Sequence, residues 1–493
     1  MSISTIDPEV IAGYEAVIGL EVHAQLLTRT KAFSRAPTEF GAVANTNTDP
    51  VVLGHPGTLP VVNRKMIEFT LRMGLATGCT IRPRSTFARK NYFYPDLPKG
   101  YQISQFDEPI CYQGVIEIEP EEGLTKRIGI TRIHMEEDTG KMIHDLDLDN
   151  TLVDLNRAGT PLIEIVSEPD IRSAREAYLY LTQIKGIVVY LGICSGNMEE
   201  GALRCDANVS VRKRGAPEFG TKAEVKNMNS FRGVEKAIEY EILRQIEVLE
   251  SGGRVEQETR LWDATTRTTR PMRSKEFAHD YRYFPEPDLA PVIVTEEMLE
   301  GIRSALPELA IARRRRFVQE YGIPAYDATV LTDSRELGDY FEAVVSALPS
   351  RDPERSKGAS NIIMTDVLRI VTDQRIDIGS FPIAPARLAE LVELFASDTI
   401  SSKNVKDIFA GMLTSDRSAA EISREMGFVQ ISDSSFLEDA ITAVLEKNPQ
   451  QVASYREGKK SLFGFFVGET MKLTAGKANP KLVTEILKTR LDQ

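Results

Sequence analysis

The first part of the chain alternates apolar and polar residues in several short runs. This pattern is found in three segments: residues 17–27, 204–212 and 221–226. A period of two residues is typical of a β-strand with one buried face. Apolar residues instead recur at helical spacing in three intervening segments: residues 64–77, 174–191 and 232–251. We therefore predict an α+β domain with a largely antiparallel sheet, one face of which carries polar groups.

After residue 295 the pattern becomes helical. Five segments with short breaks predict helices: residues 296–306, 308–321, 334–348, 360–372 and 385–396. A further helical unit runs from about residue 400 to the end, and a proline-rich stretch at 281–291 is typical of a domain exit. We expect three domains: residues 1–295, 296–400 and 401–493, of which the second and third are all-α.

The charge of the chain is unevenly distributed. The 493 residues carry a net charge of −12, which argues against nucleic-acid binding through bulk charge. Residues 401–493 hold 13 Lys and Arg against 12 Asp and Glu, so the first 400 residues carry −13. Any contact with RNA must therefore come from a local patch.

The last domain contains such a candidate patch. Residues 456–460 are basic with one glycine, and Phe463, Phe465 and Phe466 follow them. Cationic and aromatic side chains together can bind nucleic-acid bases and phosphates. Packing of these aromatics in the core is the alternative, and it is favoured for each Phe taken singly.

Composition also bears on the compartment. The four cysteines show no CxxC spacing, so we expect reduced, mostly buried thiols in a cytosolic protein. The N-terminus lacks the layout of a signal peptide, and the most apolar stretch, residues 187–194, is too short to span a membrane. We expect a soluble, cytoplasmic chain with no membrane contact.

Two candidate groups lie in predicted strands. Glu21, His23 and Gln25 share one face of the strand at 17–27, and the first two could bind one cation; a solvated sheet face is the alternative. Glu164 sits inside the apolar run 161–166, where a carboxylate is costly unless it is paired or metal-bound. A structural ion pair, for instance with Arg157, is the alternative for Glu164.

Two further candidates lie in polar segments. Residues 134–138 form a dense acidic cluster with one histidine, a type of group that binds Mg²⁺ through carboxylate oxygens; an exposed acidic loop is the alternative. Residues 89–101 combine Lys90 and Lys99 with tyrosines and prolines, which suits a stiff loop that contacts a substrate or nucleotide. A surface loop without a ligand remains the alternative there.

Several familiar motifs are missing from the sequence. No GxxxxGK[ST] or GxGxxG occurs, so neither a P-loop nor a dinucleotide fingerprint is supported. The absence of HExxH and GxSxG weakens the zinc-protease and serine-hydrolase classes. If the chain uses ATP, Mg²⁺ on carboxylates together with Lys and Arg must hold the phosphates.

Taken together, the motifs resemble a known family over nearly the whole length. The chain is similar to the GatB family, which supplies one of the three subunits of GatCAB, the bacterial glutamyl/aspartyl-tRNA amidotransferase. The matching segments are residues 17–23, 90–96, 101–106, 134–138, 154–157, 159–165, 199–206 and 280–287.

The resemblance implies an activity and its partners. A GatB chain would phosphorylate the side-chain carboxylate of Glu or Asp misacylated onto tRNA(Gln) or tRNA(Asn), using ATP and Mg²⁺. Ammonia from the glutaminase subunit, GatA, would then displace the phosphate and give the amide. The chain would work in a heterotrimer with GatA and the small subunit, GatC.

The resemblance also implies a fold and a site. It places the metal and kinase ligands at Glu21, His23, Glu137 and Glu164. Lys90 and Lys99 would lie near the channel exit and the phosphates, and we expect Arg157 and Lys90 to contact the nucleotide. The implied fold is a glutamine synthetase-like cradle, then a helical domain and a tail that grips tRNA. Two other functions stay open: a non-catalytic tRNA-binding scaffold and a stand-alone metal-dependent hydrolase.

Overall fold

A computed structural model describes most of the chain. It covers residues 6–121, 123–144, 146–147, 149–272, 281–428, 434–474 and 478–491. The chain forms two compact units, Met1–Leu309 and Ala310–Gln493. The family-like segment at 280–287 begins with Asp280, which lies outside the described residues.

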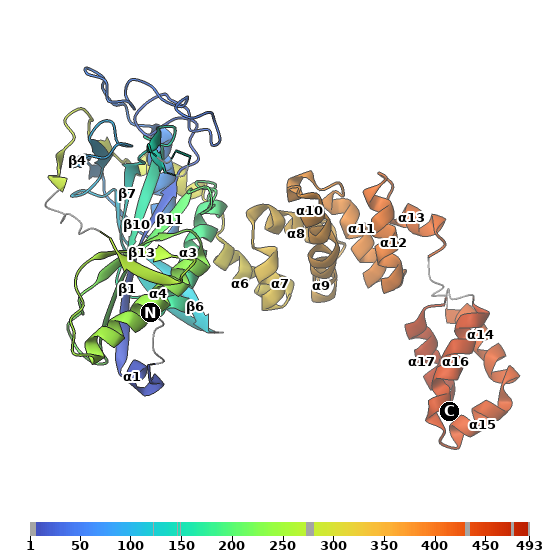
Figure 1. The fold of residues 1–493 in the computed structure, drawn as a ribbon. Coiled ribbons are helices and arrows are strands. Elements are labelled where there is room, and N and C mark those ends of the chain that lie inside the picture. Colours follow the sequence, from blue (N-terminus) through green and yellow to red (C-terminus); the bar gives the residue numbers. More distant parts are fainter. Residues whose placement is uncertain are drawn as a thin grey trace. The chain divides into compact units, whose positions relative to one another are not determined.

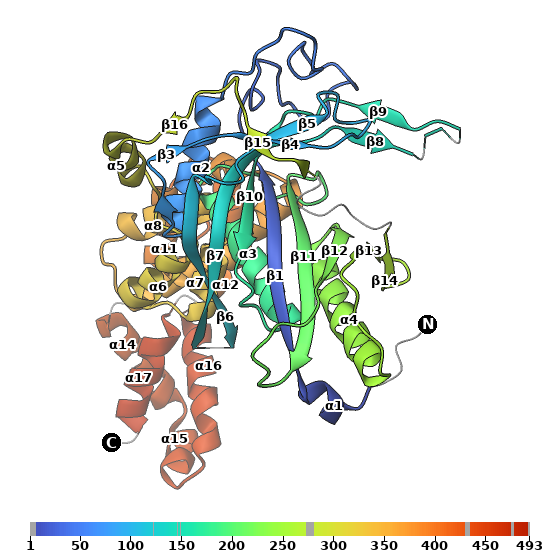
Figure 2. The same cartoon turned by 90° about the vertical axis from the view of Figure 1, so that its left-hand side faces the viewer.

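The first unit is built on a nine-stranded sheet (Figures 1 and 2). Its strands, in spatial order, are β14 (Thr268–Pro271), β13 (Thr259–Asp263), β12 (Ala223–Met228), β11 (Leu203–Lys213), β1 (Tyr14–Gln25), β10 (Pro161–Ser167), β7 (Leu124–Glu137), β6 (Cys111–Glu121) and β2 (Thr80–Ile81). All neighbours pair antiparallel except β12 and β13, which are parallel. The large, largely antiparallel sheet expected from the sequence is therefore present.

One face of this sheet is covered by helices α2 (Arg64–Ala76), α3 (Ala174–Tyr190) and α4 (Phe231–Glu250). The apolar positions of β1, among them Ile18, Leu20 and Val22, belong to one buried core with residues of all three helices. The alternation of the sequence has this physical cause, since every second side chain of a strand faces the helices. The other face is left for the polar side chains of the same strands.

Short strands surround one end of the sheet (Figure 2). The strands β4 (Ala88–Asn91), β5 (Tyr101–Ser104) and β15 (Phe284–Pro285) form a small sheet that carries Lys90. β8 (Lys141–Ile143) pairs with β9 (Leu152–Asp154), and β3 (Arg84–Ser85) pairs with β16 (Val292–Ile293). A short helix, α1 (Pro8–Ala12), precedes β1.

Helix α5 (Glu296–Ser304) packs against the core of the first unit through Ile302. The sequence pattern groups this helix with the helical domain, whereas its buried side chain joins the sheet domain. The division at residues 295 and 400 stays a prediction.

The second unit is helical throughout its described residues. Its elements are α6 (Ala310–Tyr321), α7 (Ala325–Leu331), α8 (Arg335–Ala347), α9 (Pro353–Ile362), a π-helical turn (Ile363–Val367), α10 (Leu368–Gln374), a 3₁₀ turn (Ile378–Ser380), α11 (Pro385–Ala396), α12 (Ser402–Leu413), α13 (Ala419–Glu425), α14 (Ser434–Lys447), α15 (Pro449–Arg456), a 3₁₀ turn (Lys460–Leu462), α16 (Phe463–Leu473) and α17 (Pro480–Leu491). Two separate cores hold them, one from Phe317 to Ile422 and one from Leu437 to Leu491. Over the described ranges, no helix combines the length and apolar character needed to cross a bilayer.

Candidate functional site

The polar face of the large sheet carries the first candidate site. Glu21, His23 and Gln25 alternate along β1 with fully or nearly fully buried apolar residues, as the sequence predicts. In the strand register His23 lies opposite Glu164 of β10 on one side and opposite Arg204 of β11 on the other. Strand pairing thus brings residues from distant parts of the chain onto one face.

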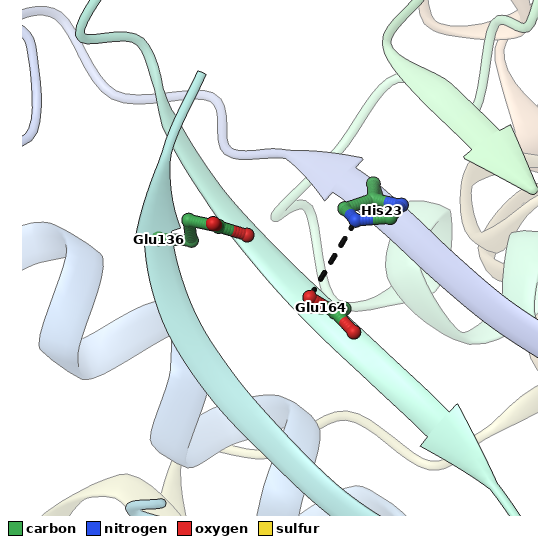
Figure 3. Close-up of side chains that lie close together, drawn as sticks. All are labelled: His23, Glu136 and Glu164. Carbon is green, nitrogen blue, oxygen red and sulfur yellow. Dashed lines mark ion pairs between the residues drawn. The ribbon is translucent and has the colours of Figure 1, made fainter. Parts of the chain in front are cut away.

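Three side chains, which we call the His23 group, meet there, as Figure 3 shows. His23, Glu136 and Glu164 each offer one ligand atom, and these atoms lie within 4.8 Å of one another. His23 Nε2 is 3.6 Å from Glu164 Oε2. A neighbouring histidine, His134, places its Nε2 3.3 Å from the same oxygen.

Burial and the neighbouring charges act in opposite directions on the pKa values of Glu164 and His23. Burial raises the pKa of Glu164, but His134 and His23 outweigh it and hold that pKa well below its usual range. Burial lowers the pKa of His23, yet the hydrogen bond and charge of Glu164 leave it raised. Glu164 is therefore an anion inside the sheet, and its neighbours are two histidines rather than Arg157, the partner that the sequence suggested.

Two carboxylates and one imidazole suit a divalent cation. Mg²⁺ takes carboxylate oxygens and keeps waters and phosphate oxygens in its remaining positions. The two carboxylates also suit Mn²⁺, and the histidine beside them suits Fe²⁺, because imidazole binds that ion well. The donor set therefore fits one cation with open positions for a substrate.

Glu137, which the resemblance names as a ligand, points elsewhere. Its Oε1 accepts a hydrogen bond from the Ile103 amide at 2.9 Å. The same oxygen forms an ion pair with Lys99 Nζ. Successive side chains of a strand face opposite sides, so Glu136 joins His23 while Glu137 turns toward β5. The structure does not bring Glu137 together with the His23 group.

Glu21 also belongs to another group. It lies with Asp206 of β11 and Glu224 of β12, and one oxygen from each lies within 4.8 Å of the others. Asn208 Nδ2 donates to Glu21 Oε1 at 2.9 Å, and Lys226 pairs with both Asp206 and Glu224, the latter at 3.0 Å. Lys226 neutralises part of this charge, so this Glu21 group is a second, weaker candidate for a cation.

The two predicted lysines lie beside the two neighbouring glutamates. Lys90 Nζ is 3.5 Å from Glu136 Oε1 and lies over the ring of Tyr281 at 5.3 Å. Burial lowers the pKa of Lys90, but the charge of Glu136 dominates and raises it well above its usual value. Lys90 is thus a charged neighbour of the His23 group, and Lys99 is a charged partner of Glu137.

Arg157 lies at the wall of a cavity. Its Nε donates to the carbonyl of Thr139 at 3.0 Å, and its Nη2 donates to that of Gly140 at 2.6 Å. The cavity measures about 560 Å³ and is lined by Gln25, Arg157, Arg204 and Asp206, among others. The cavity therefore leaves room for a nucleotide beside Arg157.

The aromatic residues of the candidate patch in the tail differ in burial. Phe466 is buried in the last core, which is the alternative that the sequence favoured, and Phe463 packs partly against that core. Phe465 is 38% exposed. Lys460 lies over the ring of Tyr455 at 4.1 Å.

The sequence identified residues 134–138 as a candidate Mg²⁺ cluster but gave His134, Glu136 and Asp138 no individual role, and it did not single out Arg204. Glu136 and His134 lie two residues apart in β7 and so share its face, which is the local signal that would have set Glu136 apart from Glu137. Asp138 and Arg204 meet at 2.9 Å, although 66 positions separate them in the chain. No local pattern signals a contact of that kind.

Comparison with known proteins agrees with this architecture. Residues 16–300 match the GatB/GatE catalytic domain, and residues 339–491 match the GatB domain. Several similar proteins are named as the B subunit of an aspartyl/glutamyl-tRNA(Asn/Gln) amidotransferase. The one from Chlorobium limicola is 56% identical over 97% of this chain and 99% of its own length.

Other relatives with that name give the same result. The protein from Prosthecochloris aestuarii is 55% identical over 97% of this chain and 98% of its own. The protein from Geotalea daltonii is 55% identical, with coverage of 97% and 99%. The His23 group lies within the matched catalytic domain. The chain therefore belongs to the GatB family, whose members carry a GatB/GatE catalytic domain.

Proposed function

We propose that this chain is the GatB component of an aspartyl/glutamyl-tRNA(Asn/Gln) amidotransferase. It acts in the cytoplasm as part of a heterotrimer with the glutaminase GatA and the small GatC chain. Its substrate is Glu-tRNA(Gln), Asp-tRNA(Asn) or both, and its products are Gln-tRNA and Asn-tRNA. The observation that carries the proposal is the His23 group on the polar face of the sheet, next to the charged Lys90.

The reaction needs an activated acyl group. A carboxylate is a poor acyl donor, and phosphorylation of its oxygen by ATP supplies a leaving group for attack by ammonia. His23, Glu136 and Glu164 would hold a divalent cation such as Mg²⁺, which supplies charge neutralisation at the phosphates. The Glu21 group offers a second position for such an ion.

The remaining site residues act through charge and position. Lys90 holds its ammonium 3.5 Å from Glu136, at the edge of the His23 group, where it can attract an anionic phosphate or carboxylate. Arg157 and the cavity beside it suit the nucleotide. Lys99 neutralises Glu137, and this pair borders the small sheet that carries Lys90.

The proposal includes a plan for the domains. The sheet domain, up to about residue 295, serves as a catalytic cradle of the glutamine synthetase type. The helices of residues 296–400 connect it to a tail, residues 401–493, that contacts tRNA. Exposed Phe465 and the neighbouring cations of the tail support RNA contact there.

A reconstituted three-subunit complex tests the proposal. With each misacylated tRNA supplied separately, ATP cleavage should depend on that tRNA and should accompany amide formation. If tRNA binds but no ATP is cleaved, a scaffold role replaces the catalytic one. Hydrolysis of a substrate by the isolated chain would instead favour a stand-alone metal-dependent hydrolase.

A further inference from the structure

A buried carboxylate organises one wall of the cavity. Asp138 is 3% exposed and follows directly after β7. It accepts hydrogen bonds from Gln25 Nε2 at 2.7 Å and from the Thr139 amide at 2.9 Å. Arg204 Nη2 pairs with it at 2.9 Å, and Arg157 Nε lies 3.6 Å away. One anion thus fixes two guanidinium groups, from β11 and from the loop before β10.

The two arginines differ in the hydrogen bonds that their N–H groups donate. Arg157 donates from Nε to the carbonyl of Thr139 and from Nη2 to that of Gly140. Arg204 Nε is enclosed and has no hydrogen-bond acceptor among the residues that the structure describes. The side chain of Arg204 is nevertheless 36% exposed and lines the cavity, so the outer N–H groups of its guanidinium can reach a bound anion.

The register places Arg204 beside both candidate cation groups. It lies opposite His23, and two residues further along the same face of β11 is Asp206 of the Glu21 group. Arg204 and Asp206 both line the cavity of about 560 Å³. An anion held at Arg204 would then lie next to a residue of each candidate cation group. That arrangement suits a phosphoryl group, which carries charge on three equatorial oxygens during transfer.

We propose that Arg204 is a catalytic residue that binds the phosphoryl group in transit, and that Asp138 is the residue that positions it. The proposal rests on the function proposed above and adds a residue to it. A side-chain carboxylate oxygen attacks the terminal phosphorus of ATP, and the bond from that phosphorus to the bridging oxygen breaks. Its electron pair leaves with ADP, and no proton is transferred. Arg204 stabilises the negative charge on the equatorial oxygens.

The test compares variants in the reconstituted three-subunit complex. Arg204→Ala and Arg204→Lys should lower kcat for tRNA-dependent ATP cleavage by about 100-fold or more. The KM for ATP should change little, because an interaction made only in the transition state alters kcat. Asp138→Asn should lower kcat by about tenfold, as expected for a group that orients another. Methylguanidinium added to Arg204→Ala should restore part of the lost rate.

A matched control comes from the same strand face. Arg212 also lies on β11 and pairs with Glu15 at 2.6 Å, near the opposite end of that strand. Arg212→Lys should leave kcat unchanged. Retained glutaminase activity of each complex shows that the variant chain is folded and assembled.

Three results would overturn the assignment. A kcat of Arg204→Ala within about threefold of the parent would remove Arg204 from the reaction. A raised KM for ATP at unchanged kcat would place the guanidinium in ground-state binding only. If the parent complex cleaves no ATP with either misacylated tRNA, the proposed function fails before any variant is compared, and the role of Arg204 falls with it.

Discussion

Glu241 joins helix α4 to the sheet that carries the site. Its side chain is fully buried, at 0% exposure. Arg244 donates to it from Nη2 at 2.6 Å and from Nε at 3.0 Å, and Thr269 of β14 donates at 3.1 Å. Gln245 donates both to Glu241 and to the carbonyl of Val209 in β11, each at 2.9 Å. The network therefore supports β11, the strand of Arg204 and Asp206, from behind.

The substitution Glu241→Gln keeps the shape of this side chain and removes its charge. Arg244 then loses its buried carboxylate, and Arg260, whose Nε is 3.4 Å from Glu241, keeps Glu258 as its carboxylate partner and its hydrogen bonds to Thr269. Breaking a buried ion pair on one side costs roughly 3–5 kcal/mol. Because Glu258 still neutralises part of the charge, we expect a loss near the lower end, about 3 kcal/mol.

Urea unfolding followed by tryptophan fluorescence measures this loss. Trp262 is the single tryptophan of the chain, is 2% exposed and lies in β13 of the same sheet. Glu239→Gln, at an exposed position of α4, is the matched control and should change stability by less than about 0.5 kcal/mol. A loss below about 1 kcal/mol for Glu241→Gln would refute the idea that this carboxylate holds the helix on the sheet.

Two further predictions concern titratable groups. Burial lowers the pKa of Lys31, from an ordinary 10.5 to about 8, so between these pH values the unfolded chain binds the proton that the folded chain has released. The free energy of unfolding of the first unit should therefore rise with pH across that window, relative to Lys31→Met. The expected rise is roughly 3 kcal/mol, at about 1.36 kcal/mol per pKa unit. Equal pH slopes of parent and variant, in unfolding followed by Trp262 fluorescence, would contradict this. All four cysteines are buried, and burial raises the pKa of Cys194 to about 11. No thiol should react quickly with Ellman's reagent in the folded chain and four should react in denaturant; rapid native labelling of any one would show that its site is open.

The alternation of polar and apolar residues was sufficient to find the working face of the sheet. It placed Glu21, His23 and Gln25 on one side of β1, and the apolar run around Glu164 correctly indicated a buried carboxylate that needs partners. These are local properties of a strand, and a two-residue period determines them. Helices α2, α3 and α4 were likewise predicted from a local pattern, the helical spacing of their apolar residues.

The partners of those residues depend on strand register, which the sequence alone does not reveal. Whether Glu136 or Glu137 joins His23 is decided by which side of β7 faces the helices, and a shift of one residue exchanges them. The sequence grouped Glu21 with His23, but pairing with β11 and β12 draws Glu21 toward Asp206 and Glu224. The contact of Asp138 with Arg204 likewise depends on two strands that are distant in the chain.

The predicted helix boundaries were wrong where a polar capping residue determines the start of the helix. The sequence predicts a helix at 360–372, whereas α9 begins at Pro353 and the helical run ends with α10 at Gln374. Asp352 caps the start by accepting from the Arg355 amide at 2.9 Å, and Pro353 occupies the first helical position. Apolar periodicity is weak in that first turn, so the cap and the proline carried the signal.

The most direct test of the central claim separates the two activities of the complex. Glu164→Gln removes the buried anion from the His23 group, while Glu168→Gln, at an exposed position just after β10, serves as the control. With ammonia supplied directly and misacylated tRNA present, Glu164→Gln should abolish ATP cleavage and amide formation, and glutaminase activity should persist. Normal ATP-dependent amidation by a folded Glu164→Gln complex would contradict the assignment of the polar sheet face as the site of phosphorylation.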